Sequence, residues 1–565
     1  MLQRLSAPAS LVSLAFFGLA VGVAACGSPG GSSGGAVEPG PTDPDGGTVA
    51  PDGGVTPIPA GGPCGVAKKG TAGLLLQGRV LAASGPIDGE VLIAAAGTIT
   101  CADASCAAGA GYADATVVKC PGAVIAPGLI NAHDHTDYNA HPPLTHGQKR
   151  WAHRNGWRTG AGGESPLPKY PSTKDVKIIA AAELRFLLGG ATTVNGSGGV
   201  GGLVRNAAAF ADKTQLEGLK SPAVFFDTFP LGDSNGTVLA TGCGYPKVRA
   251  AGTAFAGGAA YAPHISEGIN TEAENEFVCL KDTLVTAQTA IIHAVGLTAT
   301  DVDVIAKAKA KVIWSARTNI DLYGNTASVT VLKTMGVTMG LGTDWLASGS
   351  MNMLRELACV DSLNEKYFAK AFDDRAIVEL ATKGSAAVLK LDTEIGELSA
   401  GRIADIAIFY ASTAKDYRAV IEANPQDVAL VLRGGKVMYG DAGLVDALAP
   451  GCGDLMMCGN AKKVCIDTPG VTLADITAAA AASYPLFFCK GETPKDEPSC
   501  VPFRDTYPNG TSATDRDGDG VPDATDNCPS VFNPPRPLDG AKQSDVDGDG
   551  AGDACDAKPL DPAVK

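Results

Sequence analysis

A chain of 565 residues is too long for a single hydrophobic core, and roughly two to four domains are expected. Its 45% hydrophobic and 19% charged residues are typical of a globular protein. The formal net charge of −15 argues against nucleic acid as a partner, because phosphate binding requires basic patches.

The N-terminus carries one early arginine, Arg4, and then an apolar run from Leu11 to Ala25. This run is too short for a comfortable membrane span, and residues 1–25 are typical of a cleaved export signal. Val23-Ala24-Ala25-Cys26 resembles the bacterial lipobox, which implies that Cys26 carries lipid and anchors an exported protein to a bacterial membrane, at the outer membrane or cell surface. Ordinary signal cleavage near the same position is the alternative. Residues 26–62, rich in Gly, Ser and Pro, predict a flexible linker.

Fourteen cysteines follow Cys26, and several of them are closely spaced. In an exported chain an even number of cysteines predicts disulfides, although their pairing cannot be deduced from the sequence. A cysteine-rich zinc site is not expected, because C-x2-C spacing is absent.

Two predicted strands, 74–81 and 89–93, are separated by turn residues and have no helix between them. They indicate a small β-domain. An apolar run at 123–126 then leads into Pro127-Gly128-Leu129-Ile130-Asn131-Ala132-His133-Asp134-His135. Side chains alternate along a strand, so His133 and His135 are expected to point the same way and to share one metal ion.

Helices and strands alternate in the next part of the chain. Ser172 is predicted to begin a helix, with Asp175 as a capping-box residue and Val176 on the apolar face. Further strands are predicted at 191–194, 223–226, 290–293, 312–314 and 337–340, and further helices at 301–309 and 329–335. This alternation indicates an α/β fold with a parallel sheet, and a length of about 260 residues suits a (β/α)8 TIM barrel.

Four more candidate residues lie at or just after predicted strands: His264, Glu267, His293 and Asp344. Barrel enzymes keep their active sites at the C-terminal ends of the strands, so these residues are expected to converge with His133 and His135. Residues 136–171 form a long polar and aromatic loop that contains His141, His146 and His153. Loops of this length inside a compact domain are usually functional or disordered.

The chain from about Gly73 to Gly440 resembles the amidohydrolase superfamily, in its cytosine-deaminase, guanine-deaminase and triazine-hydrolase-like branch. The motifs that match are Pro127 to His135, His264-x-x-Glu267, His293 to Leu297, Ser315 to Asn319, Gly342 to Trp345, and Gly396 to Ile406. The resemblance implies a metal-dependent hydrolase barrel at 126–390. It also implies a small β-sandwich composed of residues 63–125 and 391–445.

The same resemblance implies a metal held by His133, His135, His264 and Asp344, with His293 close to the metal or to substrate oxygen. No strand-borne lysine of the bridging type is found, so one divalent transition metal is expected, with zinc first and iron as the alternative. Three imidazoles and a carboxylate leave room for a water whose pKa the metal lowers. Asp344 is expected to take the water proton, Glu267 to pass it to a leaving nitrogen, and His293 to stabilise the oxyanion.

The C-terminal part contains a Cys-rich segment, 446–513, and then two copies of D-x-D-G-D-G that begin at Asp515 and Asp545. Alternate carboxylates followed by glycine suit a calcium loop, but the EF-hand glutamate is missing. Residues 514–565 resemble thrombospondin type 3 repeats, which implies pairing of Cys528 with Cys555. It also implies calcium binding by acidic residues: Asp515, Asp517, Asp519, Asp523, Asp526, Asp545, Asp547, Asp549, Asp553 and Asp556.

The resulting hypothesis is an exported, lipid-anchored, metal-dependent hydrolase that acts on non-peptide C–N bonds of a small molecule. The loop 136–171 and the sequence Ser315-Ala316-Arg317-Thr318-Asn319 depart from the deaminase pattern, so the broader hydrolase is favoured over a deaminase of a nitrogenous heterocycle. A non-catalytic, calcium-dependent surface binding protein is the alternative of another class, and the complete ligand set argues against it. The sequence leaves the substrate and homo-oligomerisation open.

Overall fold

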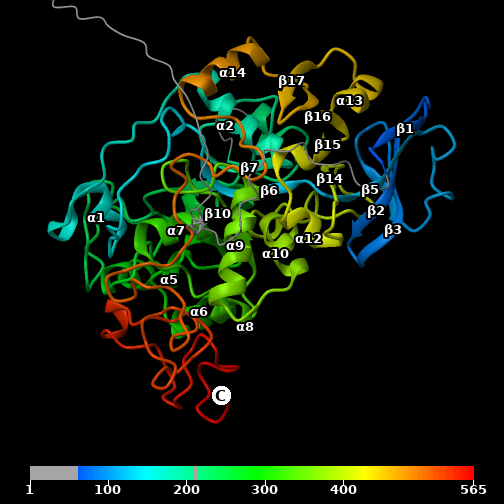
Figure 1. The fold of residues 1–565 in the computed structure, drawn as a ribbon. Coiled ribbons are helices and arrows are strands. Elements are labelled where there is room, and N and C mark those ends of the chain that lie inside the picture. Colours follow the sequence, from blue (N-terminus) through cyan, green and yellow to red (C-terminus); the bar gives the residue numbers. More distant parts are fainter. Residues whose placement is uncertain (1–61, 209–212) are drawn as a thin grey trace, which may run out of the picture. The chain divides into compact units, whose positions relative to one another are not determined.

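The computed structural model describes residues 62–208 and 213–565 (Figure 1). The predicted export signal, the lipidation site at Cys26 and nearly all of the predicted linker lie outside the described residues. Within them, no helix has both the length and the apolar character needed to cross a membrane.

Eight parallel strands build the centre of the described fold, and their C-terminal ends carry the candidate site residues. One sheet has the order β6-β7-β8 and the other β13-β12-β11-β10-β9. An isolated parallel bridge between Asp134 and Asp344 joins the ends of β6 and β13. The strands are β6 (Leu129–His135), β7 (Ala191–Ser197), β8 (Arg205–Asn206), β9 (Phe225–Asp227), β10 (Tyr261–Ile265), β11 (Ala290–His293), β12 (Lys311–Trp314) and β13 (Met339–Leu341). The predicted α/β barrel architecture agrees with this arrangement.

The helices between these strands are less regular than a strict alternation predicts. Between β7 and β9 the described residues contain only one 3-10 turn, η2 (Lys213–Leu216). The other connecting and covering helices are α1 (Arg154–Thr159), α2 (Val176–Leu188), α3 (Ala251–Ala254), α4 (Thr271–Val278), α5 (Lys281–Leu284), α6 (Ala299–Lys307), α7 (Ala316–Tyr323), α8 (Val329–Thr334), α9 (Met353–Tyr367), α10 (Asp374–Leu380) and α11 (Lys383–Val388).

The start of α2 corrects a prediction. The helix begins at Val176 rather than Ser172, and Asp175 is itself the N-cap, accepting a hydrogen bond from the Lys177 backbone N–H at 2.9 Å. A carboxylate that accepts a hydrogen bond from an otherwise unpaired N–H in the first turn favours the start of the helix at the next residue. Val176 is 49% exposed, so the buried face begins only at Ile179.

A ten-stranded sheet is built from segments before and after the barrel (Figure 1). Its order is β17-β18-β16-β15-β14-β5-β2-β3-β4, with β1 paired to β5. The strands of the expected β-sandwich thus form one continuous hydrogen-bonded sheet. Because β17 and β18 belong to this sheet, it extends past the predicted domain boundary at residue 445. The strands are β1 (Gly65–Lys68), β2 (Leu74–Ala82), β3 (Gly85–Ile93), β4 (Ile99–Asp103), β5 (Thr116–Pro127), β14 (Ile406–Tyr410), β15 (Val428–Arg433), β16 (Lys436–Asp441), β17 (Gly453–Met457) and β18 (Asn460–Val464). Helices α12 (Asp416–Ile421) and α13 (Ala442–Leu448) lie between its strands in sequence.

After β18 come helix α14 (Leu473–Ala482) and a long, mostly irregular segment with one 3-10 turn, η5 (Pro537–Asp539). Part of this segment lies beside α6 and α8 (Figure 1). Seven disulfides pair all fourteen cysteines of the described residues, which confirms the predicted use of disulfides. The pairs are Cys64–Cys120, Cys101–Cys106, Cys243–Cys279, Cys359–Cys500, Cys452–Cys465, Cys458–Cys489 and Cys528–Cys555.

Candidate metal centre

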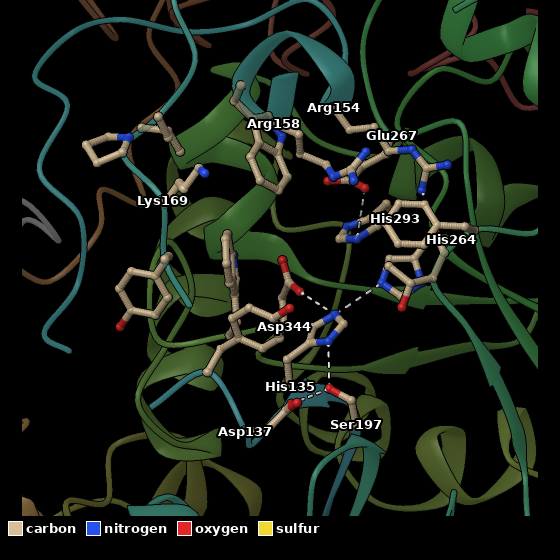
Figure 2. Close-up of a pocket in the computed structure, with 18 residues that line it drawn as sticks. His135, Asp137, Arg154, Arg158, Lys169, Ser197, His264, Glu267, His293 and Asp344 are labelled. Carbon is tan, nitrogen blue, oxygen red and sulfur yellow. Dashed lines mark hydrogen bonds and ion pairs between the residues drawn. The ribbon is translucent and has the colours of Figure 1, made fainter. Parts of the chain in front are cut away.

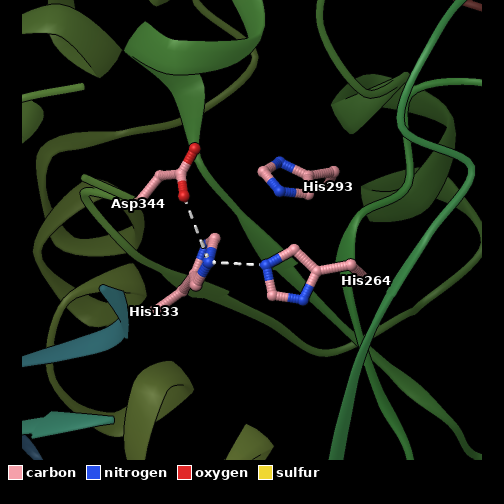
Figure 3. A group of neighbouring side chains, drawn as sticks. All are labelled: His133, His264, His293 and Asp344. Atoms are coloured by element: carbon pink, nitrogen blue, oxygen red, sulfur yellow. Dashed lines mark hydrogen bonds and ion pairs between the residues drawn. The ribbon is translucent and has the colours of Figure 1, made fainter. Parts of the chain in front are cut away.

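Three histidines and one aspartate meet at the C-terminal ends of the barrel strands (Figure 3). His133 lies on β6, His264 on β10, His293 at the end of β11, and Asp344 three residues after β13. All four are buried, and one ligand atom from each lies within 4.8 Å of the others. The convergence of strand ends therefore places four potential ligands around one point.

The nitrogens face one another at distances that suit a shared ion. His133 Nε2 lies 3.1 Å from His264 Nε2 and 3.3 Å from Asp344 Oδ1. Two nitrogens bound to one zinc ion at about 2.0–2.1 Å in tetrahedral geometry would be about 3.3 Å apart. The observed spacing therefore fits a single transition-metal ion.

His135 belongs to the same constellation, although it is less buried. Its Nε2 lies 3.4 Å from His264 Nε2 and 3.7 Å from Asp344 Oδ1. The structure thus brings together all four predicted ligands, and it adds His293 to the tightest group. His133 and His135 reach the same point because they are two residues apart on β6.

Hydrogen bonds to the second ring nitrogens fix the tautomers of two of these histidines, His135 and His264. Ser197 Oγ donates its proton to Asp137 Oδ1 at 2.5 Å, so it must accept from His135 Nδ1–H at 2.9 Å. His264 Nδ1 donates to the backbone carbonyl of Asp227 at 3.2 Å. In both rings Nε2 is left with a free lone pair that points into the centre, which is the protonation state that a metal ligand needs.

Burial sets the protonation of the whole group. Loss of water lowers the pKa of His135 to about 3 and holds the pKa values of His133 and His264 well below 6.5, with neighbouring histidines adding to each shift. Burial raises the pKa of Asp344 far above its ordinary value, and the nearby Glu267 raises it further. Neutral, converging imidazoles beside a buried carboxylate are a donor set that suits a divalent transition metal.

Helix α7 and its N-cap residue, Ser315, contact the group through side chains whose roles the sequence does not predict. Ser315 Oγ lies 2.9 Å from His133 Nδ1, Thr318 Oγ1 donates to Asp344 Oδ2 at 2.9 Å, and Asn319 Oδ1 accepts from His293 Nδ1 at 3.0 Å. The resemblance singles out the motif from Ser315 to Asn319 without implying roles for these side chains. Its hydroxyl and amide groups, at the start of a helix beside a strand end, were the available signal.

Glu267 stands beside the metal group but outside it. Its Oε2 lies 3.7 Å from His293 Nε2, and its Oε1 accepts a hydrogen bond from Tyr323 Oη at 2.6 Å. The side chain is buried, and it also lines the adjoining cavity. A carboxylate held in this way is placed to exchange protons with a bound molecule.

Two site residues adopt a left-handed backbone that non-glycine residues rarely use. The φ angle is 72° at His293 and 67° at Asp344. Such conformations cost of the order of 1–3 kcal/mol and persist where the surroundings enforce them, most often at functional sites.

A cavity of about 370 Å³ opens onto the metal group (Figure 2). The loop 136–171 supplies half of its eighteen lining residues, among them Tyr138, Trp157 and Tyr170. Trp345, from the segment after β13, packs against all three rings at centroid distances of 5.5–5.8 Å. The loop therefore contributes an aromatic wall to the cavity, and Tyr138 in this wall lies at a ring distance of 5.8 Å from His135.

The three loop histidines do not join the metal group. His146 Nε2 lies 2.8 Å from Asp321 Oδ2, and His153 caps α1 while its Nε2 lies 3.2 Å from Glu276. His141 packs against Tyr170 at a ring distance of 5.6 Å. These residues hold the loop against the barrel.

The acidic tail contains two further carboxylate groups, Asp515/Asp517/Asp519 and Asp545/Asp547/Asp549. Burial raises the pKa of Asp517 to about 8, and the neighbouring carboxylates of Asp519 and then Asp526 contribute to this shift. The pKa of Asp547 is likewise raised, by burial and then by the charges of Asp549 and Asp556.

The structure does not bring the remaining two predicted calcium ligands into these groups. Both oxygens of Asp523 bind Arg516, and both oxygens of Asp553 accept hydrogen bonds, from Val546 N–H and Ser544 Oγ. These two carboxylates brace the ends of their loops.

Comparison with known proteins supports the family assignment over part of the chain. Residues 251–438 match the family model for the amidohydrolase family. Among curated proteins, a 5-methylthioadenosine/S-adenosylhomocysteine deaminase from Nitratidesulfovibrio vulgaris is 30% identical over 174 residues, covering 28% of this chain and 38% of that protein. The Halobacterium salinarum enzyme of the same name is 31% identical over 162 residues, covering 27% and 37%. The chain thus spans less than half the length of these relatives.

The fold is similar to that of atrazine chlorohydrolase TrzN from Arthrobacter aurescens TC1, solved in complex with zinc. The TM-score is 0.52 at 19% identity, covering 72% of this chain and 99% of the other. At this identity the likeness concerns the fold alone.

Proposed function

We propose that this chain, whose residues 251–438 match the amidohydrolase family model, is a metal-dependent hydrolase of non-peptide C–N bonds in a small molecule. The observation that carries the proposal is the convergence of His133, His264 and Asp344, with His135 and His293 beside them. A non-catalytic binding protein has no need of such a buried donor set.

The residues present would hold one divalent metal through His133, His135, His264 and Asp344, with zinc as the expected ion and iron as the alternative. When bound, it would act as a Lewis acid and lower the pKa of water. Asp344 lies where it can accept a proton from the attacking water, while Thr318 holds its other oxygen.

Glu267 is placed to deliver that proton to the nitrogen that leaves, because its carboxylate reaches into the cavity and is oriented by Tyr323. His293, fixed through its Nδ1 by Asn319, lies where it can donate from Nε2 to a developing oxyanion when it is protonated. Water is restricted around these groups because all of them are buried.

The cavity favours a small planar substrate. Its volume of about 370 Å³ suits a ligand of one or two rings, and its aromatic wall offers stacking surfaces. Deamination of a nitrogenous heterocycle is the narrower candidate, and the names of the curated relatives favour it.

The test is hydrolysis by the purified, zinc-loaded protein of a substrate panel. Primary amides and amino-substituted heterocycles are followed by ammonia release, and lactams are followed by ring opening. We expect turnover of at least one class, and loss of that turnover in Asp344→Asn. Retained turnover in Asp344→Asn would overturn the proposed mechanism.

We further propose that residues 514–565 bind calcium. Asp517 is only 1% exposed, and its Oδ2 has no hydrogen-bond partner, as is also true of one oxygen each of Asp515 and Asp526. Buried, unpartnered carboxylate oxygens are costly without a cation, and oxygen ligands at alternate positions suit calcium.

Export and lipid anchoring through Cys26 also remain our proposal. The seven disulfides support it, because disulfides persist in oxidising compartments outside the cytoplasm. Incorporation of a labelled fatty acid, lost in Cys26→Ser, would test the anchor.

A further inference from the structure

Tyr323 connects the end of α7 to the proposed proton-transfer residue. Its hydroxyl donates to Glu267 Oε1 at 2.6 Å and accepts from Trp157 Nε1 at 2.7 Å. The tyrosine is fully buried. The direction in which the Glu267 carboxylate points therefore depends on where α7 ends.

The end of α7 is held by a residue from the C-terminal segment. Arg504 Nη1 donates to the backbone carbonyl of Tyr323 at 2.7 Å, and the helix stops at Gly324, whose φ is 68°. The last carbonyls of a helix lack intrahelical partners, and a cation at this end is favourable. Arg504 thus acts as an external C-terminal cap.

Arg504 reaches Glu267 by a second route. The same Nη1 lies 3.0 Å from the carbonyl of Trp151, whose own N–H donates to the carbonyl of Leu322 at 2.9 Å. Three residues further on, the Arg154 N–H donates to the backbone carbonyl of Glu267 at 2.9 Å. One guanidinium nitrogen therefore joins the two backbone segments that hold the side chain and the main chain of Glu267.

The segment around Arg504 runs along α7. Arg317 Nη1 donates to the Pro498 carbonyl at 2.6 Å, and Ser499 N–H donates to Asp321 Oδ1 at 3.2 Å. Tyr507 Oη donates to the carbonyl of Gly324 at 3.3 Å, and a disulfide joins Cys500 to Cys359 on α9. This segment, 498–507, lies outside residues 251–438, which match the family model.

We propose that Arg504 is a positioning residue, which sets the orientation of Glu267 through Tyr323, and that segment 498–507 is part of the support of the active site. The inference rests on the proposed function, in which Glu267 transfers the proton. It assigns a role in turnover to a part of the chain that carries no residue of the metal group.

A double-mutant cycle on a substrate found with the substrate panel tests the proposal. Arg504→Met is expected to lower kcat about tenfold, with KM nearly unchanged and metal content intact. Arg504→Lys, which keeps one donor, should recover part of kcat. In a Tyr323→Phe background Arg504→Met should have little further effect on kcat, because the two changes break the same link. An equal loss in both backgrounds would overturn the proposal.

A substrate-free measurement keeps the two proposals separate. Trp157 is one of four tryptophans, so the fluorine NMR spectrum of 5-fluorotryptophan-labelled protein can follow it once Trp157→Phe assigns the signal. Arg504→Met is expected to shift the Trp157 signal in the direction produced by Tyr323→Phe. The matched control Arg375→Met, which removes a peripheral arginine paired with Glu379, should leave it in place. An unmoved signal in Arg504→Met overturns this inference, whereas full activity of Glu267→Gln overturns the proposed function.

Discussion

Ser315 Oγ lies 2.9 Å from Nδ1 of His133, although 182 residues separate them in the sequence. The contact sets the orientation of the imidazole so that Nε2 faces His264 and Asp344. Removal of such a partner commonly lowers metal affinity by about 10–100-fold. The residues that orient the candidate ligands can therefore be tested by mutation in the same way as the candidate ligands.

Ser315→Ala is expected to weaken metal affinity by about 10–100-fold, because His133 loses the group that orients its ring. Competition with a chromophoric chelator measures the change. Ser483→Ala, at the C-cap of α14, removes a hydroxyl that donates to the Ala479 carbonyl of the same helix, and it should leave the affinity unchanged. Equal affinities of Ser315→Ala and wild type would contradict the role assigned to Ser315.

Glu267→Gln keeps the shape of the side chain but removes its ability to transfer a proton. We expect kcat to fall by about 10²–10⁴-fold, as is typical for loss of a general acid–base group. Metal content should stay at the wild-type level, because Glu267 lies outside the metal group. Steady-state kinetics check the prediction against Glu422→Gln, an exposed glutamate whose loss should leave kcat unaltered.

The metal-free protein should lose stability as the pH falls. Burial lowers the pKa of His135 to about 3, whereas the unfolded residue titrates near 6.5. Between these values the unfolded chain binds a proton that the folded chain does not, so the free energy of unfolding decreases as the pH falls through this window.

Asp344 contributes with the opposite sign, since burial raises its pKa. The informative quantity is therefore the difference between wild type and His135→Gln in urea unfolding, at about pH 7 and about pH 5. The wild type should lose more stability than the variant. Equal losses would show that His135 is not buried in its neutral form.

Calcium should stabilise the tail through its buried carboxylates. Adding Ca²⁺ to calcium-free protein, with zinc kept saturating, is expected to raise Tm and the protease resistance of residues 514–565. Asp517→Asn should abolish most of this response because Asp517 is almost fully buried and its Oδ2 has no hydrogen-bond partner. Asp561→Asn, which lies outside both groups, should retain the response, and a calcium response that survives Asp517→Asn would contradict the site.

Much of the barrel and its site could be predicted from the sequence, because a short stretch of sequence is enough to show where a strand ends and which residues follow it. His293 ends β11 at the predicted residue, and His133 and His135 share a strand face as alternation requires. The contacts of Ser315, Tyr323 and Arg504 could not be predicted, since each joins segments far apart in the chain. Nor could the bracing role of Asp523, because one carboxylate in an acidic repeat is not distinguished from another by spacing.

The most direct test of the account is the metal content of the purified protein, measured by plasma mass spectrometry alongside His264→Ala. The account predicts one equivalent of transition metal, expected to be zinc, per wild-type chain and loss of this metal in the variant, with both proteins folded by circular dichroism. A folded wild type that takes up no transition metal when zinc is supplied, or a variant that keeps the full equivalent, would contradict it.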